Sequence, residues 1–205
     1  MKNYGFRAAA AILLGCVCAC SGFAGDIGGK VTAEGIKSMA SMVVYIDGFP
    51  TRTSEGAAGH AAVHQKNMTF IPHVLPVVQG TTVDFWNDDP VQHAVSWPSV
   101  AGNRKLAHYL GVWPQGEMRS FTFNDLGAVP LLCPLHPEMS GYVIVVPTAY
   151  YALTDDDGNF TIKDVPPGDY TLKVWSEEGE QVLQTVHVAD ASTTVRFTVR
   201  RAARR

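Results

Sequence analysis

The chain has 205 residues, of which 46% are hydrophobic and 17% charged, so it can fill one large or two small cores. Its formal net charge of −3 at pH 7 excludes the strongly basic balance of nucleic-acid-binding proteins, and we expect no nucleic acid as a partner.

The first 24 residues have the pattern of a secretory signal peptide. Lys2 and Arg7 precede an uncharged apolar run, residues 8–20, which is too short to span a bilayer. Cleavage after Ala24 would place the protein in the periplasm or otherwise outside the cytoplasm. The segment Leu13-Leu14-Gly15-Cys16 loosely resembles a lipobox, so a lipid-anchored form, with membrane attachment, is the alternative.

Signal removal would leave a single cysteine. Cys16, Cys18 and Cys20 lie in residues 1–24, and Cys133 is the remaining one. A lone cysteine forms no internal disulfide, and an oxidising compartment is a poor place for a free thiol. Either Cys133 is buried and inert, or something occupies it.

From Asp26 onward the chain reads as short strands separated by turns, without a sustained helical period. Strand-forming residues are concentrated at 30–32, 42–46, 61–64, 81–86, 119–123, 142–146, 165–175, 182–188 and 193–199. This spacing predicts an all-β protein built as an antiparallel sandwich or barrel. We expect residues 200–205, which are basic, to form a solvated tail.

Two turn motifs mark the region after Pro147. Asp157-Gly158-Asn159-Phe160-Thr161-Ile162 is followed by a Pro-Gly turn and an alternating strand at 165–174. Residues 148–199 thereby resemble the transthyretin-like sandwich of carboxypeptidase regulatory-like domains. They supply only about five strands, few for a sandwich of about seven. Residues 26–50 look like the opening strands of that family, and we expect them to pair with 148–199. The plainer alternative leaves 26–50 as the first strands of the region that follows.

The most informative run is Cys133-Pro134-Leu135-His136-Pro137-Glu138-Met139. It brings a thiolate, an imidazole and a thioether together at the spacing C-x2-H-x2-M. Thiolate and thioether select copper, and imidazole suits both of its common oxidation states. A His2Cys site with a weak axial Met is the blue-copper arrangement, and His93, which follows the strand-like segment 81–86, is the candidate for the second histidine.

The region 57–147, almost continuously from Ala61 to Pro147, resembles the plastocyanin and amicyanin branch of the cupredoxins. The resemblance runs from segment 70–77 through Trp86-Asn87 and His93 to the closing strand at 141–145, and the short ligand loop is most like that of amicyanin. It implies a Greek-key β-sandwich, which the expected pairing of 26–50 with 148–199 would make an insertion between those two segments. It also implies one type 1 copper ion held by His93, Cys133, His136 and Met139, with the Asn87 side chain helping to tie the ligand loops together. Ala94 departs from the family, which commonly has Asn there, as do Leu131-Leu132, where an aromatic residue is usual.

The other histidines show no ligand spacing. His60 and His64 are four residues apart and are not expected to share a face in a strand or loop, and we interpret both, with His73, His108 and His187, as structural or exposed. The acidic run at 155–159 does not match a calcium loop, because Phe160 and Pro166 occupy the positions that require Gly and Glu.

Copper with four such ligands has no vacant strong position for a substrate, so we expect an electron carrier rather than an enzyme. Its partner would be an unidentified redox protein that contacts an apolar rim around Leu135. The alternatives are a copper protein for storage, delivery or sensing, and a non-redox structural or adhesion module. The chain has none of the His-x-His pairs that multicopper oxidases need.

Overall fold

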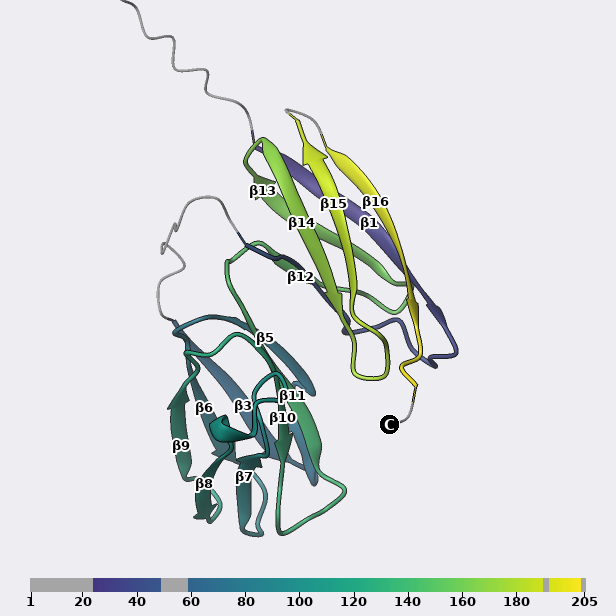
Figure 1. The fold of residues 1–205 in the computed structure, drawn as a ribbon. Helices are drawn as coiled ribbons and strands as arrows, with labels where there is room; N and C mark the ends of the chain where they lie inside the picture. The colour runs from purple at the N-terminus through teal and green to yellow at the C-terminus, as the bar shows by residue number, and fades with distance from the viewer. Residues whose placement is uncertain (1–23, 49–58, 190–191, 204–205) are drawn as a thin grey trace, which may run out of the picture.

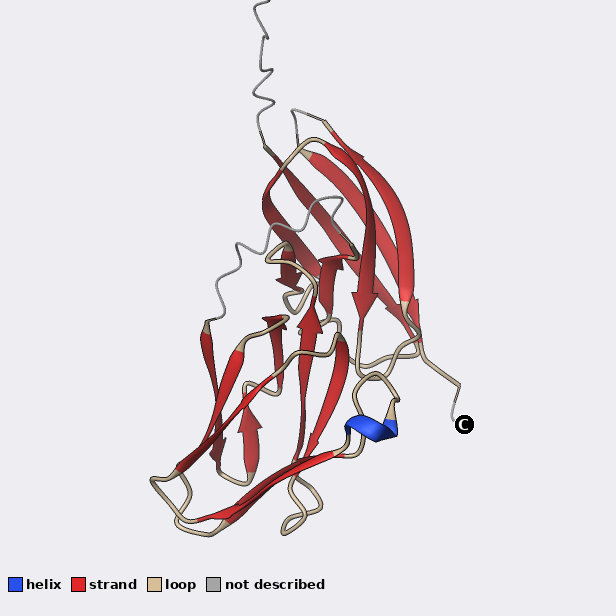
Figure 2. Ribbon diagram, turned by 60° about the vertical axis from the view of Figure 1, so that its left-hand side comes forward, coloured by secondary structure: helices blue, strands red, loops and turns tan. Residues whose placement is uncertain are grey.

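We describe a computed structural model of the chain, in which residues 24–48, 59–189 and 192–203 are described. Across these residues there are sixteen strands and one 3-10 turn, η1 (Arg104–Leu106), and the prediction of an all-β fold is confirmed. The strands form two β-sandwiches that lie one above the other (Figure 1). The short helical turn lies beside the lower sandwich (Figure 2). No helix among the described residues has the length and apolar character needed to cross a membrane.

The first sandwich comprises residues between 59 and 146 and has two facing sheets, of strand order β5-β11-β10-β7-β8 and β4-β3-β6-β9. Its strands are β3 (His60–Lys66), β4 (Thr69–Ile71), β5 (Val74–Val78), β6 (Thr82–Asn87), β7 (His93–Trp97), β8 (His108–Trp113), β9 (Met118–Thr122), β10 (Gly127–Leu132) and β11 (Ser140–Val146). Side chains alternate in and out along these strands, and the inward ones enclose a core that includes Phe85, Trp97 and Trp113.

The second sandwich is built from both ends of the chain. Its sheets have the strand orders β13-β1-β16 and β12-β2-β14-β15. Its strands are β1 (Gly25–Glu34), β2 (Val43–Ile46), β12 (Tyr151–Leu153), β13 (Asn159–Val165), β14 (Gly168–Trp175), β15 (Val182–Val188) and β16 (Thr193–Arg200). β1 hydrogen-bonds with β13 and β16, and β2 with β12 and β14. The first sandwich is therefore an insertion between β2 and β12.

Two sequence expectations need correction. The sheets are not purely antiparallel, because among the described strands β1–β16, β3–β6 and β5–β11 pair in parallel. Each of these pairs joins strands connected through other elements, as parallel pairing requires. The basic C-terminal segment is also not wholly a tail. Arg200 ends β16 and pairs with Glu34, and Arg201 pairs with Glu178.

The two sandwiches pack against each other through a separate apolar cluster. Val43 and Tyr45 of β2 meet Val74 of β5, with Ile144 and Val146 of β11. All four residues of β2 are buried, because one face of the strand lies in the second core and the other in this contact. Predicted features at residues 1–23, 49–50 and 57–58, including the signal peptide, lie outside the described residues.

Candidate metal centre

Three predicted ligands meet at one end of the first sandwich. His93 begins β7, while Cys133 and His136 lie in the loop between β10 and β11. His93 Nδ1 lies 3.0 Å from His136 Nδ1. Cys133 Sγ lies 3.9 Å from His93 Nδ1 and 3.6 Å from His136 Nδ1. Among the described residues, these three form the one group of His, Cys and acidic side chains arranged to hold a metal ion.

The spacing of the three atoms fits a metal ion. Atoms separated by 3.0, 3.6 and 3.9 Å lie on a circle with a radius of about 2 Å. Nitrogen and sulfur ligands bind a metal such as zinc at roughly 2.0–2.3 Å, so an ion between the three atoms would be within bonding distance of each. One thiol and two imidazoles form a donor set suited to copper or zinc.

Met139 closes the ligand loop. Its side chain is 1% exposed and lies in the same buried cluster as Cys133. The backbone N–H of Met139 donates to the His136 carbonyl at 2.9 Å, and that of His136 donates to the Cys133 carbonyl at 3.1 Å. These two tight turns bring the three residues of the C-x2-H-x2-M motif back to one region, with Met139 as the candidate fourth ligand.

A buried carboxylate orients the His93 ring. His93 Nε2 lies 2.9 Å from Asp89 Oδ2, and the His93 side chain is fully buried. Because a carboxylate oxygen accepts, Nε2 donates to Asp89, and Nδ1 is the ring atom that faces Cys133 and His136. Metal-binding histidines commonly have such a carboxylate partner.

The same carboxylate holds a strained hairpin turn. Asn67 and Met68 connect β3 to β4 with φ values of 53° and 59°, the left-handed pair of a type I′ turn. This conformation is unfavourable for Met. Asp89 accepts the backbone N–H groups of both residues, at 2.7 and 2.9 Å. Burial favours a higher pKa of Asp89, but the bonds from Met68, His93 and Asn67 outweigh it and lower that pKa.

Gln65 supports the segment that contacts the sulfur. The backbone N–H of Ala94 points at Cys133 Sγ at 3.5 Å, and the Ala94 carbonyl accepts from Gln65 Nε2 at 3.1 Å. The Gln65 carbonyl also accepts from the backbone N–H of Asp88. Gln65 thus contacts the chain on both sides of Asp89–His93, from a strand in the opposite sheet.

Asn87 also braces the loop that leads to His93. Its Nδ2 donates to the carbonyl oxygens of Val91 and Trp113, and its Oδ1 accepts from the backbone N–H of Asp89. These bonds join the His93 loop to the end of β8. They do not include the 133–139 loop, to which the resemblance had also assigned Asn87.

The centre is buried except at His136. Cys133 is 2% exposed and His93 0%, whereas His136 is half-buried. Leu135 beside it is 47% exposed and Val91 is 45% exposed. His136 is therefore the predicted ligand nearest solvent, and exposed apolar side chains lie beside it in its own loop (Leu135) and in the loop before His93 (Val91).

The remaining histidines lie elsewhere, and one expectation about them is wrong. His60 and His64 both lie on β3 and face the same way, because residues four apart in a strand share a face. Each pairs with a different aspartate, His60 with Asp84 at 3.1 Å and His64 with Asp88 at 2.9 Å. They form two surface pairs rather than a shared site.

Sequence reasoning missed Asp89 and Gln65. Asp88-Asp89-Pro90 reads as an exposed acidic turn, and Gln65 as one polar residue in a strand. The sequence does show that Asp89 lies four residues before His93. This spacing indicates a role for Asp89 only when the β3–β4 turn is known to supply two N–H donors to its carboxylate.

The comparisons with known proteins cover parts of the chain. Residues 147–196 match the family model of polysaccharide lyase family 4, domain II. No curated protein matches the chain in sequence. Among solved structures, an amicyanin variant in the Cu(I) form is 24% identical with a TM-score of 0.39, covering 42% of this chain and 81% of that one.

Two further solved structures are similar to this protein over a comparable fraction of its chain. A purple cupredoxin from Nitrosopumilus maritimus is 25% identical with a TM-score of 0.37, covering 42% of this chain and 98% of that one. A copper-containing nitrite reductase from Thermus scotoductus is 27% identical with a TM-score of 0.40, covering 43% of this chain and 22% of that one. Because these similarities cover less than half of the chain, we base its function on the arrangement of its own side chains.

Proposed function

We propose that this protein is an exported type 1 copper protein of the cupredoxin kind that transfers single electrons between redox partners. The observation that carries the proposal is the approach of His93 Nδ1, His136 Nδ1 and Cys133 Sγ to within 3.9 Å of one another. Met139 would be the weak fourth ligand. Copper bound by these groups would supply one-electron exchange between Cu(I) and Cu(II).

The residues around the centre favour electron transfer because they restrict rearrangement. Asp89 fixes the His93 ring, Asn87 fixes the loop before it, and Gln65 fixes Ala94 beside the sulfur. A donor set held in this way changes little when the charge of the bound ion changes, so the energy needed for reorganisation stays small.

The apolar surface at His136 suits a brief encounter with a protein partner. Transient electron-transfer interfaces are small, and the exposed Leu135 and Val91 side chains would supply apolar area for one. Export is proposed from the signal-like N-terminus and from the use of the single remaining cysteine as a ligand.

Replacement of Leu135 by Glu tests this role. We expect electron exchange to slow roughly tenfold, about 1.4 kcal/mol, while the copper absorption stays unchanged. Leu183→Glu is the matched control, since Leu183 is 54% exposed on β15 of the second sandwich. Equal rates in both variants would count against electron entry at His136.

Storage or delivery of copper is the competing function, and voltammetry with a chelator separates the two. An electron carrier should give a reversible one-electron wave and release copper slowly, because three of its four ligands are buried. Rapid loss of copper to the chelator without a reversible wave would favour delivery instead.

A further inference from the structure

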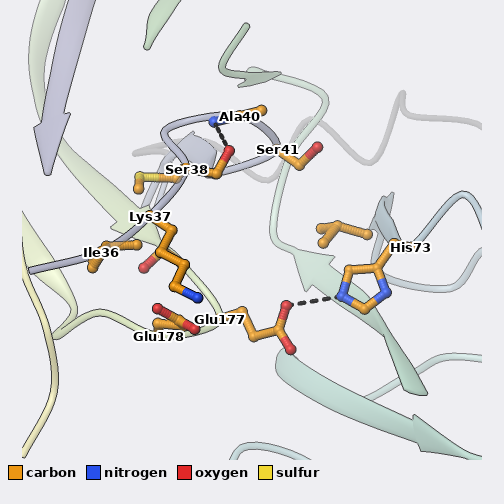
Figure 3. Close-up of a pocket in the computed structure, with 11 residues that line it drawn as sticks. Ile36, Lys37, Ser38, Ala40, Ser41, His73, Glu177 and Glu178 are labelled. Carbon is orange, nitrogen blue, oxygen red and sulfur yellow. Dashed lines mark hydrogen bonds and ion pairs between the residues drawn. The ribbon is translucent and has the colours of Figure 1, made fainter. Parts of the chain in front are cut away.

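A hydrogen-bonded bridge joins the second sandwich to the segment that follows Met139. His73 lies in the turn between β4 and β5, and Glu177 lies in the loop between β14 and β15. His73 Nε2 is 2.8 Å from Glu177 Oε2, and His73 Nδ1 is 3.1 Å from the carbonyl oxygen of Ser140. Figure 3 shows the ring and the carboxylate facing each other. Both residues line a cavity of about 300 Å³, to which both sandwiches contribute residues.

Both partners of the His73 ring are hydrogen-bond acceptors, the carbonyl oxygen of Ser140 at one nitrogen and the carboxylate of Glu177 at the other. Because the imidazole ring is rigid, the contact with Glu177 fixes the orientation in which the other nitrogen faces Ser140. Glu177 therefore supports the contact that His73 makes with Ser140.

The backbone of His73 also hydrogen-bonds to the start of β11. The backbone N–H of Tyr142 donates to the His73 carbonyl at 2.7 Å. Gly141 allows this approach, because a Cβ there would lie 3.0 Å from the His73 oxygen and 3.1 Å from Phe70 Cβ. Ser140 directly follows Met139, so His73 contacts the two peptide groups, Ser140–Gly141 and Gly141–Tyr142, by which the chain leaves Met139.

Glu177 has a second contact in the first sandwich. The pKa of Tyr142 is raised by burial, and further by the charge of Glu177 and a hydrogen bond to it. The neighbouring Glu178 instead pairs with Arg201 within the second sandwich. Lys37, from the loop between β1 and β2, lines the same cavity. Glu177 and Glu178 are thus adjacent carboxylates with different partners, and only the first of these pairings crosses to the first sandwich.

We propose that Glu177 and His73 are positioning residues for Met139, so that the second sandwich sets how the axial thioether approaches the metal. The metal part of this inference rests on the proposed blue-copper function, whereas the link from Glu177 to Met139 does not. It gives the second sandwich a role in the copper centre.

The link is tested first in metal-free protein by NMR of the backbone amides. Glu177→Gln keeps the shape of the side chain and replaces a charged acceptor by a neutral amide, which holds the His73 ring less firmly. The contact of His73 with Ser140 should therefore weaken, and the amide resonances of residues 139–141 should shift; Tyr142 is left out because it contacts Glu177 directly. Glu178→Gln is the control and should leave those resonances in place. Unshifted amides in Glu177→Gln would overturn the proposal whether or not copper binds.

The effect on the metal is tested by the reduction potential of the copper-loaded protein. Glu177→Gln should raise the potential, because a less firmly held axial thioether favours Cu(I), while Glu178→Gln should not. Shifted amides in a protein that shows no thiolate-to-copper absorption would refute the proposed function and leave the link standing. If the protein is blue and Glu177→Gln leaves its reduction potential unchanged, the proposed effect of Glu177 on the axial ligand is refuted, but the proposed copper function is not.

Discussion

The two sandwiches share an architecture but differ in what they bury. The second has an apolar core, and the buried polar side chains within its described residues are the hydroxyls of Thr154 and Ser176, which hydrogen-bond to the backbone. The first has Gln65, Asn87, Asp89 and His93 buried at one end, next to Cys133. Burying such groups is costly unless each has a partner.

The buried polar side chains of the second sandwich have structural roles, whereas those of the first include groups that could bind a metal ion. The hydroxyls of Thr154 and Ser176 accept hydrogen bonds from nearby backbone N–H groups, so a structural role accounts for their burial. The Cys133 thiol and the Nδ1 atoms of His93 and His136 instead face one another, and Asp89 contacts the far side of the His93 ring. These three atoms could bind a metal ion, a capacity that the stability of the fold does not require. The first sandwich therefore buries polar side chains at one end, where we propose the metal centre, and the second sandwich buries mainly apolar ones.

The largest expected effect concerns the core of the second sandwich. Phe197 is 3% exposed and packs against the Phe160 ring at 6.1 Å. Phe197→Ala should lower the free energy of unfolding by about 3–5 kcal/mol, because it removes buried area and leaves a cavity. In denaturant titrations a loss below about 1 kcal/mol would show that this core is less tightly packed than described. The folded variant should keep its copper absorption.

A smaller effect is expected from the carboxylate behind His93. Asp89→Asn puts an N–H group where a carboxylate oxygen accepts, so the His93 ring loses its fixed orientation. Copper affinity should fall roughly 10–100-fold, as for other partners of metal-binding histidines. Asp88→Asn is the control, because Asp88 pairs with His64 at the surface. Competition with a chelator measures both, and equal affinities would remove Asp89 from the centre.

The contact between the sandwiches should respond to alkaline pH. Burial raises the pKa of Tyr45 to about 12, and the Asp47 carboxylate adds to this. In the unfolded chain a tyrosine ionises near pH 10. The contribution of Tyr45 to the free energy of unfolding is therefore complete below about pH 10 and is lost as the pH rises to about 12. The free energy of unfolding should fall by about 2 kcal/mol from this cause in wild type, and Tyr45→Phe should lack this fall. Parallel stability profiles for the two proteins between pH 10 and 12 would contradict the burial of this hydroxyl.

Features that depend on a few neighbouring residues could be read from the sequence. The all-β class followed from strand and turn spacing. The candidate ligand loop followed from C-x2-H-x2-M, because two tight turns bring Cys133, His136 and Met139 back to one region. Counting strands in 148–199 led to the expected pairing with 26–50, and the registers of β1 and β2 have that pairing.

Features that depend on long-range contacts could not be read in the same way. The burial of Asp89 depends on a hairpin more than 20 residues earlier, whose strained N–H groups it accepts. The partners of His73 come from β11 and from the second sandwich, so its position depends on how two separately formed cores pack. The error about His60 and His64 was of another kind, since alternation along a strand already puts residues four apart on one face.

The proposed copper centre is best tested by the visible and electron paramagnetic resonance spectra of the Cu(II)-loaded protein, recorded beside those of Cys133→Ser. We expect an intense thiolate-to-copper charge-transfer band with narrow copper hyperfine splitting, both lost in the variant. A colourless protein, or spectra that the Cys133→Ser substitution leaves unchanged, would rule out a type 1 copper site at Cys133.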